Sequence, residues 1–370
     1  MKKTFKVAVA ASVLASPAMA YVPGQMYSTV NNMENPLYLP TKHEFYSKLS
    51  NSVMLKVADD TVAHKKKNHD GDVEFPIIRI QEEMGFGLTD RWALNFAVQY
   101  THDNDIGRTG LSDGRLGTTY RLFTPENNNG WTWDAYGDLR LGGIGEMRGQ
   151  YNVTITNPKT MAIDGIFDYD NYSDGMWGVH VGTKFGRVWN ERFTTSAFVE
   201  YMRSFGADNN TIRVVGDNTA IMPPLTLSDL GSVNISSATL LAAKGVPSTI
   251  VADLKDKEEL SLGANAFYHW TEKLTSGIWF RYNHRDDAGV DKIKTNLGGL
   301  EGMKPVLEKM LSDMEDGFDE YIVGLSLAHQ FTEHAQVALY GEYTFDTAHK
   351  NSQNGTDVKA EMGVRVNFKF

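Results

Sequence analysis

The sequence predicts an all-β protein, a transmembrane antiparallel β-barrel of about 12 strands (roughly 10 to 14) with long extracellular loops that carry short helices. Three observations predict this fold. They are an amphipathic strand at the C-terminus, an export signal at the N-terminus, and strand pairs joined by tight turns at one end and by long loops at the other.

Residues 358–370 alternate strictly between apolar and polar side chains. Successive side chains of a strand point to opposite faces, so one face of this segment is apolar and the other is charged. Such a strand suits a wall between lipid and water. The aromatic ending, Phe368 and Phe370, resembles the signal that outer-membrane barrels present to their assembly machinery, so we expect that machinery to be a partner.

The N-terminus reads as an export signal. Lys2, Lys3 and Lys6 precede a short apolar run, which is followed by Ala18-Met19-Ala20, so residues 1–20 are predicted to be a cleaved signal peptide that directs export through the inner membrane. Residues 21–43 contain three prolines and no sustained alternation, and we interpret them as a periplasmic lead-in that can tuck into the barrel mouth. Residues 44–370 are assigned to the barrel.

Composition excludes several classes of protein. The chain has no cysteine, which excludes disulfide frameworks and thiolate metal sites. Its 46 acidic residues against 36 basic ones make it a poor candidate for nucleic-acid binding. The mean hydropathy of −0.35 agrees with a barrel whose lumen and loops are polar. We expect neither a cofactor nor a metal site.

Amphipathic segments can be traced along the whole of the predicted barrel. A spanning sheet cannot leave an edge unpaired in lipid, so the first segment is expected to pair with the last. Glu82 falls on the lipid face of the second segment, which predicts a bulge or an error in the assigned register there. The segments are residues 44–57, 76–88, 92–100, 114–123, 131–141, 176–185, 192–201, 259–270, 274–284, 318–331, 335–345 and 358–370.

The long loops are predicted at about residues 58–75, 143–175, 204–258 and 285–317. Within the second loop, residues 151–157 and 161–169 could extend the barrel wall as a hairpin or fold into the mouth. The third loop does not look like a strand, and either plugs the pore or projects outward. Helices are predicted over residues 236–244, 248–257 and 303–316, from Ala/Leu-rich composition, serine caps and helical apolar spacing.

Three predicted hairpins share a short turn of the form Thr followed by Asp or Glu, as in residues 87–100, 270–282 and 331–343. With the signal and the aromatic C-terminus, the stretch GFGLTDRWAL at residues 85–94 resembles the outer-membrane channel family named after the meta-pathway of phenol degradation. The resemblance implies uptake or efflux of small, often apolar or aromatic compounds, and no catalytic residues.

Inward-facing side chains are the candidate functional residues, because they are what a solute meets in a channel. The charged ones form either a neutralising network that braces the wall or a transverse field across a constriction, and the aromatic ones either fill space or provide a track for apolar solutes. The charged candidates are Arg115, Arg121, Asp134, Asp138, Arg140, Arg281, Glu361 and Arg365, and the aromatic candidates are Tyr136, Phe267, Trp279 and Tyr340.

The favoured function is a channel in the cell outer membrane for passive or facilitated passage of small solutes, with apolar or aromatic compounds as candidates. Lipid and lipopolysaccharide are the expected surroundings, and the basic stretch at residues 64–69 could touch lipopolysaccharide. The main alternative is a structural or adhesive barrel whose loops bind a partner. A hydrolase is a weaker alternative: acidic clusters with histidine occur at residues 102–105 and 284–287, but no Gly-x-Ser-x-Gly stretch occurs, so we expect no enzyme activity.

Overall fold

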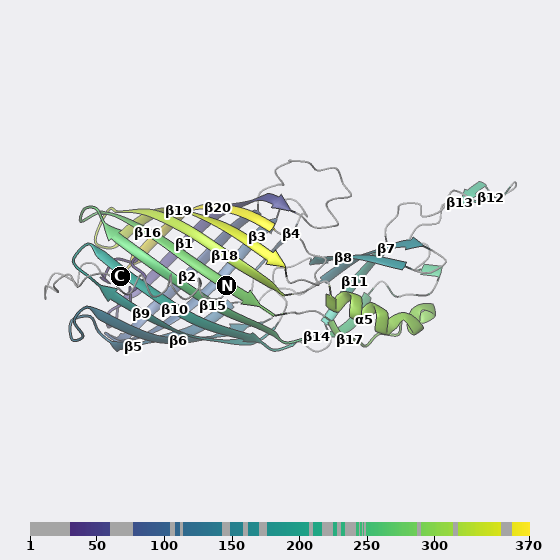
Figure 1. Ribbon diagram of the computed structural model, residues 1–370, viewed down its shortest axis with the longest axis horizontal. Helices are drawn as coiled ribbons and strands as arrows, with labels where there is room; N and C mark the ends of the chain where they lie inside the picture. The colour runs from purple at the N-terminus through teal and green to yellow at the C-terminus, as the bar shows by residue number, and fades with distance from the viewer. Residues whose placement is uncertain are drawn as a thin grey trace, which may run out of the picture.

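The fold is described from a computed structural model of the chain (Figure 1). The structure describes residues 30–59, 77–103, 108–111, 114–142, 149–157, 162–169, 176–206, 210–216, 225–227, 231–233, 242–243, 245, 247, 249–286, 290–313, 317–348 and 357–370. The predicted signal peptide and the basic stretch at 64–69 lie outside these residues.

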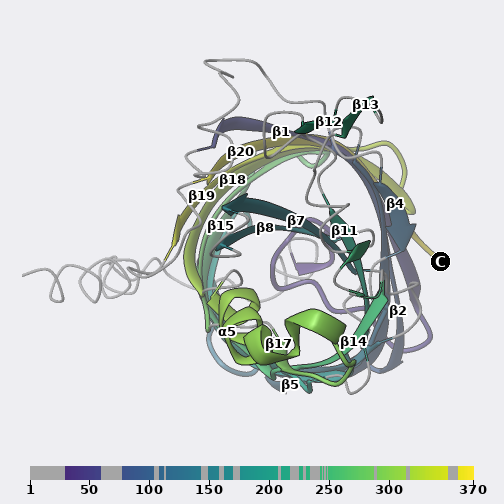
Figure 2. The same cartoon turned by 90° about the vertical axis from the view of Figure 1, so that its right-hand side faces the viewer.

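The strands form a closed antiparallel barrel, as predicted (Figures 1 and 2). The main sheet has 13 strands, of which the short β4 (Arg108–Leu111) pairs only with β3, so 12 strands make the ring. In chain order the ring strands are β1 (Phe45–Asp59), β2 (Ile77–Thr89), β3 (Trp92–Asp103), β5 (Gly114–Phe123), β6 (Trp131–Leu141), β9 (Gly178–Val188), β10 (Phe193–Ser204), β15 (Lys257–His269), β16 (Leu274–Arg285), β18 (Phe318–Gln330), β19 (Ala335–Ala348) and β20 (Asp357–Lys369).

The last strand closes the barrel on the first. β20 pairs with β1 in a register that runs from Tyr46↔Lys369 to Asp59↔Asp357, with one irregularity between Lys56 and Ala58. The backbones of Phe45 and Phe370 add reciprocal hydrogen bonds of 3.0 and 2.8 Å beyond the ladder. The predicted pairing of the first and last segments is therefore confirmed. No helix among the described residues is long and apolar enough to cross a membrane.

Side chains alternate between lumen and exterior along the ring strands, as the sequence pattern predicted. On β20, Met362 and Val364 are exposed on the outside, whereas Arg365 and Asn367 point into the lumen, where both contact the N-terminal segment. The predicted bulge at Glu82 is wrong. The β1–β2 ladder runs unbroken from Phe45↔Phe86 to Met54↔Ile77, and the Ser47 hydroxyl donates a 2.6 Å hydrogen bond to the Glu82 carboxylate on the outer face.

Tight turns join the strands at the end of the barrel where β1 begins and β20 ends, and long connections leave the other end. This asymmetry marks the first end as periplasmic and the second as extracellular. The extracellular connections build a second sheet in the order β17-β14-β11-β7-β8, which stands beyond the ends of the barrel strands (Figure 1). Its strands are β7 (Gly149–Asn157), β8 (Ala162–Tyr169), β11 (Asn210–Gly216), β14 (Thr249–Leu254) and β17 (Val290–Ile293).

Some of the predicted loop elements are confirmed and others are wrong. Residues 151–157 and 161–169 form the β7–β8 hairpin, and the helix predicted over 303–316 is α5 (Lys304–Asp313), preceded by a 3-10 turn, η1 (Gly298–Met303). The helix predicted over 248–257 is wrong, because β14 occupies that stretch and pairs with both β11 and β17. The expectation that loop 204–258 contains no strand is also wrong, since β12 (Leu225–Leu227) and β13 (Gly231–Val233) lie there too. The helix predicted over 236–244 falls almost entirely outside the described residues.

Residues 30–44, which we call the N-terminal segment, lie inside the barrel at its periplasmic end, as the purple trace within the ring shows (Figure 2). The segment contains turns rather than strand, and much of it is buried, including Met33 and Leu37. Short-range bonds shape it: the Asn32 side chain accepts a hydrogen bond from the Glu34 amide, and the Asn35 side chain accepts one from the Leu37 amide, both 2.9 Å long. Such local side-chain bonds are what Asn provides in turns.

Candidate functional site

The N-terminal segment crosses the lumen from one wall to the opposite one. It contacts β20 at one side and β9 at the other, and β9 is the sixth neighbour of β20 in either direction around the ring. The segment therefore spans the full width of the barrel rather than lining one side. Because it lies in the path of any solute, its contacts are the first part of the candidate site.

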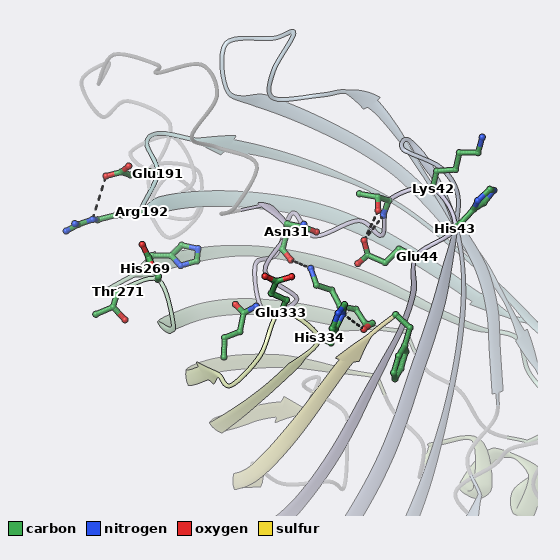
Figure 3. A pocket seen from close by; sticks show the side chains of 15 residues that line it. Asn31, Lys42, His43, Glu44, Glu191, Arg192, His269, Thr271, Glu333 and His334 are labelled. Carbon is green, nitrogen blue, oxygen red and sulfur yellow. Dashed lines mark hydrogen bonds and ion pairs between the residues drawn. The ribbon is translucent and has the colours of Figure 1, made fainter.

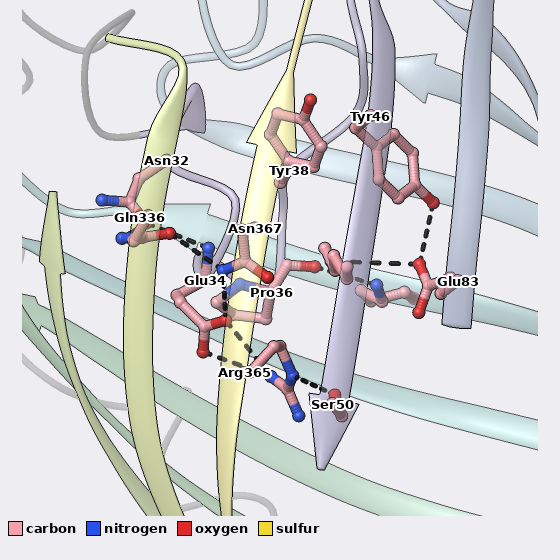
Figure 4. Close-up of polar contacts among 12 residues, drawn as sticks. Asn32, Glu34, Pro36, Tyr38, Tyr46, Ser50, Glu83, Gln336, Arg365 and Asn367 are labelled. Atoms are coloured by element: carbon pink, nitrogen blue, oxygen red, sulfur yellow. Dashed lines mark hydrogen bonds and ion pairs between the residues drawn. The ribbon is translucent and has the colours of Figure 1, made fainter. Parts of the chain in front are cut away.

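On the β20 side, the segment is held by a carboxylate in a polar pocket (Figure 4). Both Glu34 carboxylate oxygens lie 3.2 Å from an Arg365 guanidinium nitrogen, and the Asn367 amide donates a 2.8 Å hydrogen bond to the same carboxylate. The Glu34 side chain is only 4% exposed. Gln336 of β19 adds a 3.0 Å hydrogen bond to Asn32. Burial of the carboxylate is thus compensated by a charge and by neutral donors.

On the opposite side, two cations of the wall bind carbonyl oxygens of the segment. Arg121 of β5 donates a 2.6 Å hydrogen bond to the Leu37 carbonyl, and Lys184 of β9 donates a 2.8 Å bond to the Pro36 carbonyl. Arg121 is itself oriented by two bonds to Asp134 of β6, 2.8 and 3.0 Å long. The Leu37 side chain is fully buried over Gly186, where a Cβ would overlap it. Gly186 therefore provides the space that seats the segment.

The segment returns to the wall through Tyr38 and Glu44. The Tyr38 hydroxyl donates a 2.6 Å hydrogen bond to the Glu44 carboxylate, which also accepts a 2.7 Å bond from the Thr41 hydroxyl. Burial, together with the neighbouring Glu44 charge, raises the pKa of Tyr38 well above its usual range, so its hydroxyl stays protonated and keeps donating.

Below the segment, on the periplasmic side, lies a vestibule of about 1050 Å³ (Figure 3). Its walls come from the segment and from the periplasmic turns, and charges of both signs face it. The charged lining residues are Lys42, Glu44, Glu191, Arg192, Glu272, Glu333 and Lys369, with His43, His269 and His334 among the remainder. This vestibule is the periplasmic entrance to the lumen.

Five aromatic side chains lie along the lumen wall, each over a glycine directly opposite on the neighbouring strand. At every one of these glycines a Cβ would overlap the ring, so the missing side chain lets the ring lie flat against the wall. The register places each pair face to face. The pairs are Tyr46–Gly85, Tyr136–Gly182, Phe198–Gly263, Trp279–Gly324 and Tyr340–Gly363. They form an aromatic belt around the ring.

Cations cover the belt on its lumen side. Lys48 lies 5.3 Å from the centre of the Tyr46 ring, Lys184 lies 5.9 Å from that of Tyr136, Arg281 lies 5.1 Å from that of Phe198, and Arg365 lies 4.9 Å from that of Tyr340. These distances are typical of cation–π contacts. A solute in the lumen therefore meets positive charges backed by aromatic rings.

Carboxylates accept hydrogen bonds from polar atoms of the belt residues and from the cations beside them. Glu200 of β10 accepts 2.7 Å hydrogen bonds from the Tyr136 hydroxyl and from Arg281, and its carboxylate lies 3.7 Å from His180 Nε2. His180 Nδ1 lies 2.6 Å from the Asp138 carboxylate. Together these residues form an acid–histidine–acid cluster on the lumen wall.

A second carboxylate cluster lies on β19 and β20. Glu342 and Glu361 are direct cross-strand neighbours. Trp279 Nε1 donates a 3.0 Å hydrogen bond to Glu342, and Arg79 and Ser52 donate bonds of 3.0 and 2.5 Å to Glu361. Facing carboxylates of this kind repel one another unless cations intervene.

The structure divides the charged residues that the sequence singled out. Arg121 and Arg365 hold the N-terminal segment and Asp134 orients Arg121, whereas Asp138, Arg281 and Glu361 belong to the other clusters of the lumen. Arg140 donates a 2.8 Å bond to Ser204, and Arg115 lies directly across from it in the β5–β6 ladder. The predicted patch on β5 and β6 is therefore split between two roles.

The aromatic candidates also divide. Tyr136, Trp279 and Tyr340 belong to the belt, whereas Phe267 is buried toward the periplasmic end of β15, with its ring packed edge-on against His269. Tyr46 and Phe198 were missed as candidates. The spacing of glycines on the adjacent strands could have indicated them, but only once the register between strands was known.

The remaining sequence candidates are placed as follows. Phe368 and Phe370 lie on the outer face at the periplasmic end, with Phe370 near Phe45. His284 contacts Asp319 at 2.9 Å and Asp286 at 3.4 Å, while residues 104 and 105 of the other acidic cluster lie outside the described part. Within the described ranges, no group of three or more His, Cys, Asp or Glu side chains is arranged to hold a metal ion.

No protein-family model and no curated protein matches the chain. Among solved structures it is similar to an outer membrane channel from Pseudomonas putida F1, with 12% identity and a TM-score of 0.51 over 90% of this chain and 97% of that chain. It is also similar to the NanC porin, with 6% identity and a TM-score of 0.41 over 86% of this chain and 98% of that chain. A third similar structure is the CymD monoaromatic hydrocarbon channel, with 10% identity and a TM-score of 0.41 over 96% of this chain and 95% of that chain. The first likeness shows that the chain has the fold of an outer-membrane channel, and the weaker two add nothing to that.

Proposed function

We propose that this protein is an outer-membrane channel for small solutes and that the N-terminal segment opens and closes it. The observation that supports this proposal is the segment itself, which crosses the lumen between opposite walls. Its attachments are individual hydrogen bonds, one ion pair and the packing of the Leu37 side chain over Gly186, and none of them is part of a strand ladder of the barrel. Each polar contact contributes about 1 to 3 kcal/mol, so the contacts can break one after another.

The test is conductance in planar bilayers. The mature chain is compared with a variant that lacks residues 30–39, which removes the lumen-crossing contacts and keeps the Thr41–Glu44 attachment to the wall. The proposal expects small or intermittent currents from the full chain and large, steady currents from the shortened one. Equal currents, or no current from a folded shortened barrel, would contradict it.

For the solute, we propose a small compound with both an aromatic or apolar body and a negative charge. The support comes from the four cations that lie over rings of the aromatic belt. A guanidinium or ammonium group attracts a carboxylate, while the neighbouring rings offer apolar surface. In liposome swelling, benzoate should therefore enter faster than benzylamine of nearly the same size. Equal rates for the two would remove this specificity and leave the channel function intact.

A loop-binding barrel remains the second candidate, and the extracellular sheet is the observation that favours it. Five strands and α5 form a folded layer beyond the barrel, where loops that bind a partner would lie. A folded shortened barrel that still conducts nothing would favour this second function.

A further inference from the structure

The outer face of the barrel carries a cation held between two indole rings. The guanidinium carbon of Arg187 lies 5.0 Å from the centre of the Trp131 ring and 4.2 Å from that of Trp189. Arg187 lies next to the inward-facing Gly186 that seats Leu37, so by alternation its side chain points away from the lumen. Its partner in the β6–β9 ladder is Trp131 itself.

The position is the periplasmic edge of the membrane-facing surface. Arg187 is the next-to-last residue of β9, directly before the periplasmic turn. One outward position further into the membrane, Phe185 is 45% exposed and stacks on Trp133 with ring centres 5.0 Å apart. The guanidinium thus lies where apolar side chains give way to the turn. Aromatic girdles mark this boundary in membrane barrels, and lipid head groups lie at the same depth.

The guanidinium has no acidic partner. Across the described residues, no hydrogen bond or ion pair joins Arg187 to another side chain, and its Nε is enclosed without an acceptor. The nearest acidic residue in sequence, Glu191, pairs instead with Arg192 at 3.9 Å. Arg187 is half-buried, and a guanidinium partly removed from water without an anion is costly, so an anion supplied by the surroundings would stabilise it.

The two rings that flank Arg187, Trp131 and Trp189, which we call the clamp, are fixed in place without a ligand. Trp189 is 5% exposed, and its indole N–H donates a 2.8 Å hydrogen bond to the Thr195 hydroxyl of β10. With one ring fixed by this bond and the other by the β6 ladder, the guanidinium is stacked and its terminal amino groups remain available. A planar guanidinium with free terminal donors matches the oxygens of a phosphate group.

We propose that Arg187, Trp131 and Trp189 form a binding site for the phosphodiester head group of a phospholipid in the periplasmic leaflet. The Trp131 ring, which is half-buried, contacts the glycerol and upper acyl region, the buried Trp189 ring supports the guanidinium from behind, and the guanidinium binds the phosphate oxygens. The site fixes the depth and rotation of this side of the barrel in the membrane. It does not depend on what passes through the lumen.

The test measures phosphatidylglycerol binding to the folded protein in maltoside micelles by native mass spectrometry. Arg187→Gln should weaken binding about tenfold, because it removes charge-assisted hydrogen bonds to the phosphate. Arg192→Gln is the matched control, since Arg192 lies in the adjacent turn, is 59% exposed and is paired with Glu191. It should bind as the unmodified protein does. Equal binding by all three proteins would overturn the proposal.

A second variant and two competing compounds complete the binding test. Thr195→Val removes the hydroxyl that orients Trp189 and preserves side-chain shape, so it should weaken binding even if Arg187→Gln fails to fold. Undiminished binding by a folded Thr195→Val protein would then count against the clamp. Inorganic phosphate and a diacylglycerol without phosphate are tested in parallel, and neither should compete. Competition by phosphate alone would make this a free-anion site and would contradict the assignment to a lipid.

Discussion

Glu34 and Arg365 join the N-terminal segment to the last strand of the barrel, with both carboxylate oxygens 3.2 Å from one guanidinium nitrogen. Replacing Glu34 by Gln keeps the shape and removes the charge. Charge-assisted bonds contribute about 1.5 to 3 kcal/mol, so release of the segment should become roughly tenfold more frequent. Single-channel recordings should show a higher open fraction. Glu126→Gln, in the exposed turn between β5 and β6 and outside the vestibule lining, serves as the control and should leave the open fraction unchanged.

A covalent lock should have the opposite effect. The chain has no cysteine, and the Leu37 side chain packs directly over Gly186. We expect a Leu37→Cys/Gly186→Cys protein to form a disulfide under oxidation, which holds the segment in the lumen and suppresses conductance. Reduction should restore the current. If the oxidised, cross-linked protein conducts as well as the reduced one, the segment does not block the path.

The aromatic belt predicts different tolerances at two glycines of one hairpin. Gly363→Ala would place a Cβ against the Tyr340 ring, whereas Gly341→Ala meets only the Glu361 carbonyl, at 3.6 Å. Overpacking costs about 1 to 3 kcal/mol, so the first variant should unfold at a lower urea concentration than the unmodified barrel. Gly341→Ala should unfold at the same urea concentration as the unmodified barrel. Similar midpoints for both variants would show that the ring can move aside freely.

Charge selectivity should respond to Arg281, which neutralises Glu200 at 2.7 Å. In Arg281→Gln the carboxylate stays in the lumen with less compensation. A unit charge about 4 Å away in water changes an ion's energy by about 1 kcal/mol, so the cation-to-anion permeability ratio should rise roughly fivefold. Reversal potentials in a salt gradient measure this ratio. Arg203→Gln, on the outer face near the extracellular end, should not change it.

The lipid face of the closing strand should reject a charge. Val364 is exposed on the outside of β20, and Val364→Lys would place a cation in hydrocarbon at a cost of roughly 2 to 4 kcal/mol. We expect a lower folded fraction in vesicles, seen as loss of the heat-modifiable band on gels. Val364→Ala tests the loss of the side chain alone and should fold nearly normally. Equal folding of both variants would place Val364 away from lipid.

The sequence predicted the ring well because period-2 alternation is a local signal. It distinguished Val364 from Arg365, and it identified β1 as the partner of β20 because a membrane sheet cannot leave an edge open. Its failures are non-local. Glu82 looked misplaced because Ser47, its donor, lies on another strand. Residues 248–257 looked helical, yet neighbouring strands supply hydrogen bonds to β14 that the composition does not reveal.

The candidate site was predictable only in part for the same reason. Alternation indicates which side chains face the lumen, and Asp134 and Arg281 do so. The lack of alternation in residues 21–43 suggested a lead-in that can tuck into the barrel mouth, but it does not reveal that the segment crosses the lumen or which walls it contacts. Glu34 and Arg365 are 331 positions apart in the chain, and no pattern at either position points to the other.

The lumen-crossing contacts also order the assembly of the molecule. Residues 30–44 are synthesised before any strand of the barrel, yet their partners lie on β9 and on β20, the last strand to be made. The segment can contact both walls only after β20 has been made. Its seating is therefore a late step of maturation, and a barrel whose segment has not yet seated would be left open at its periplasmic end.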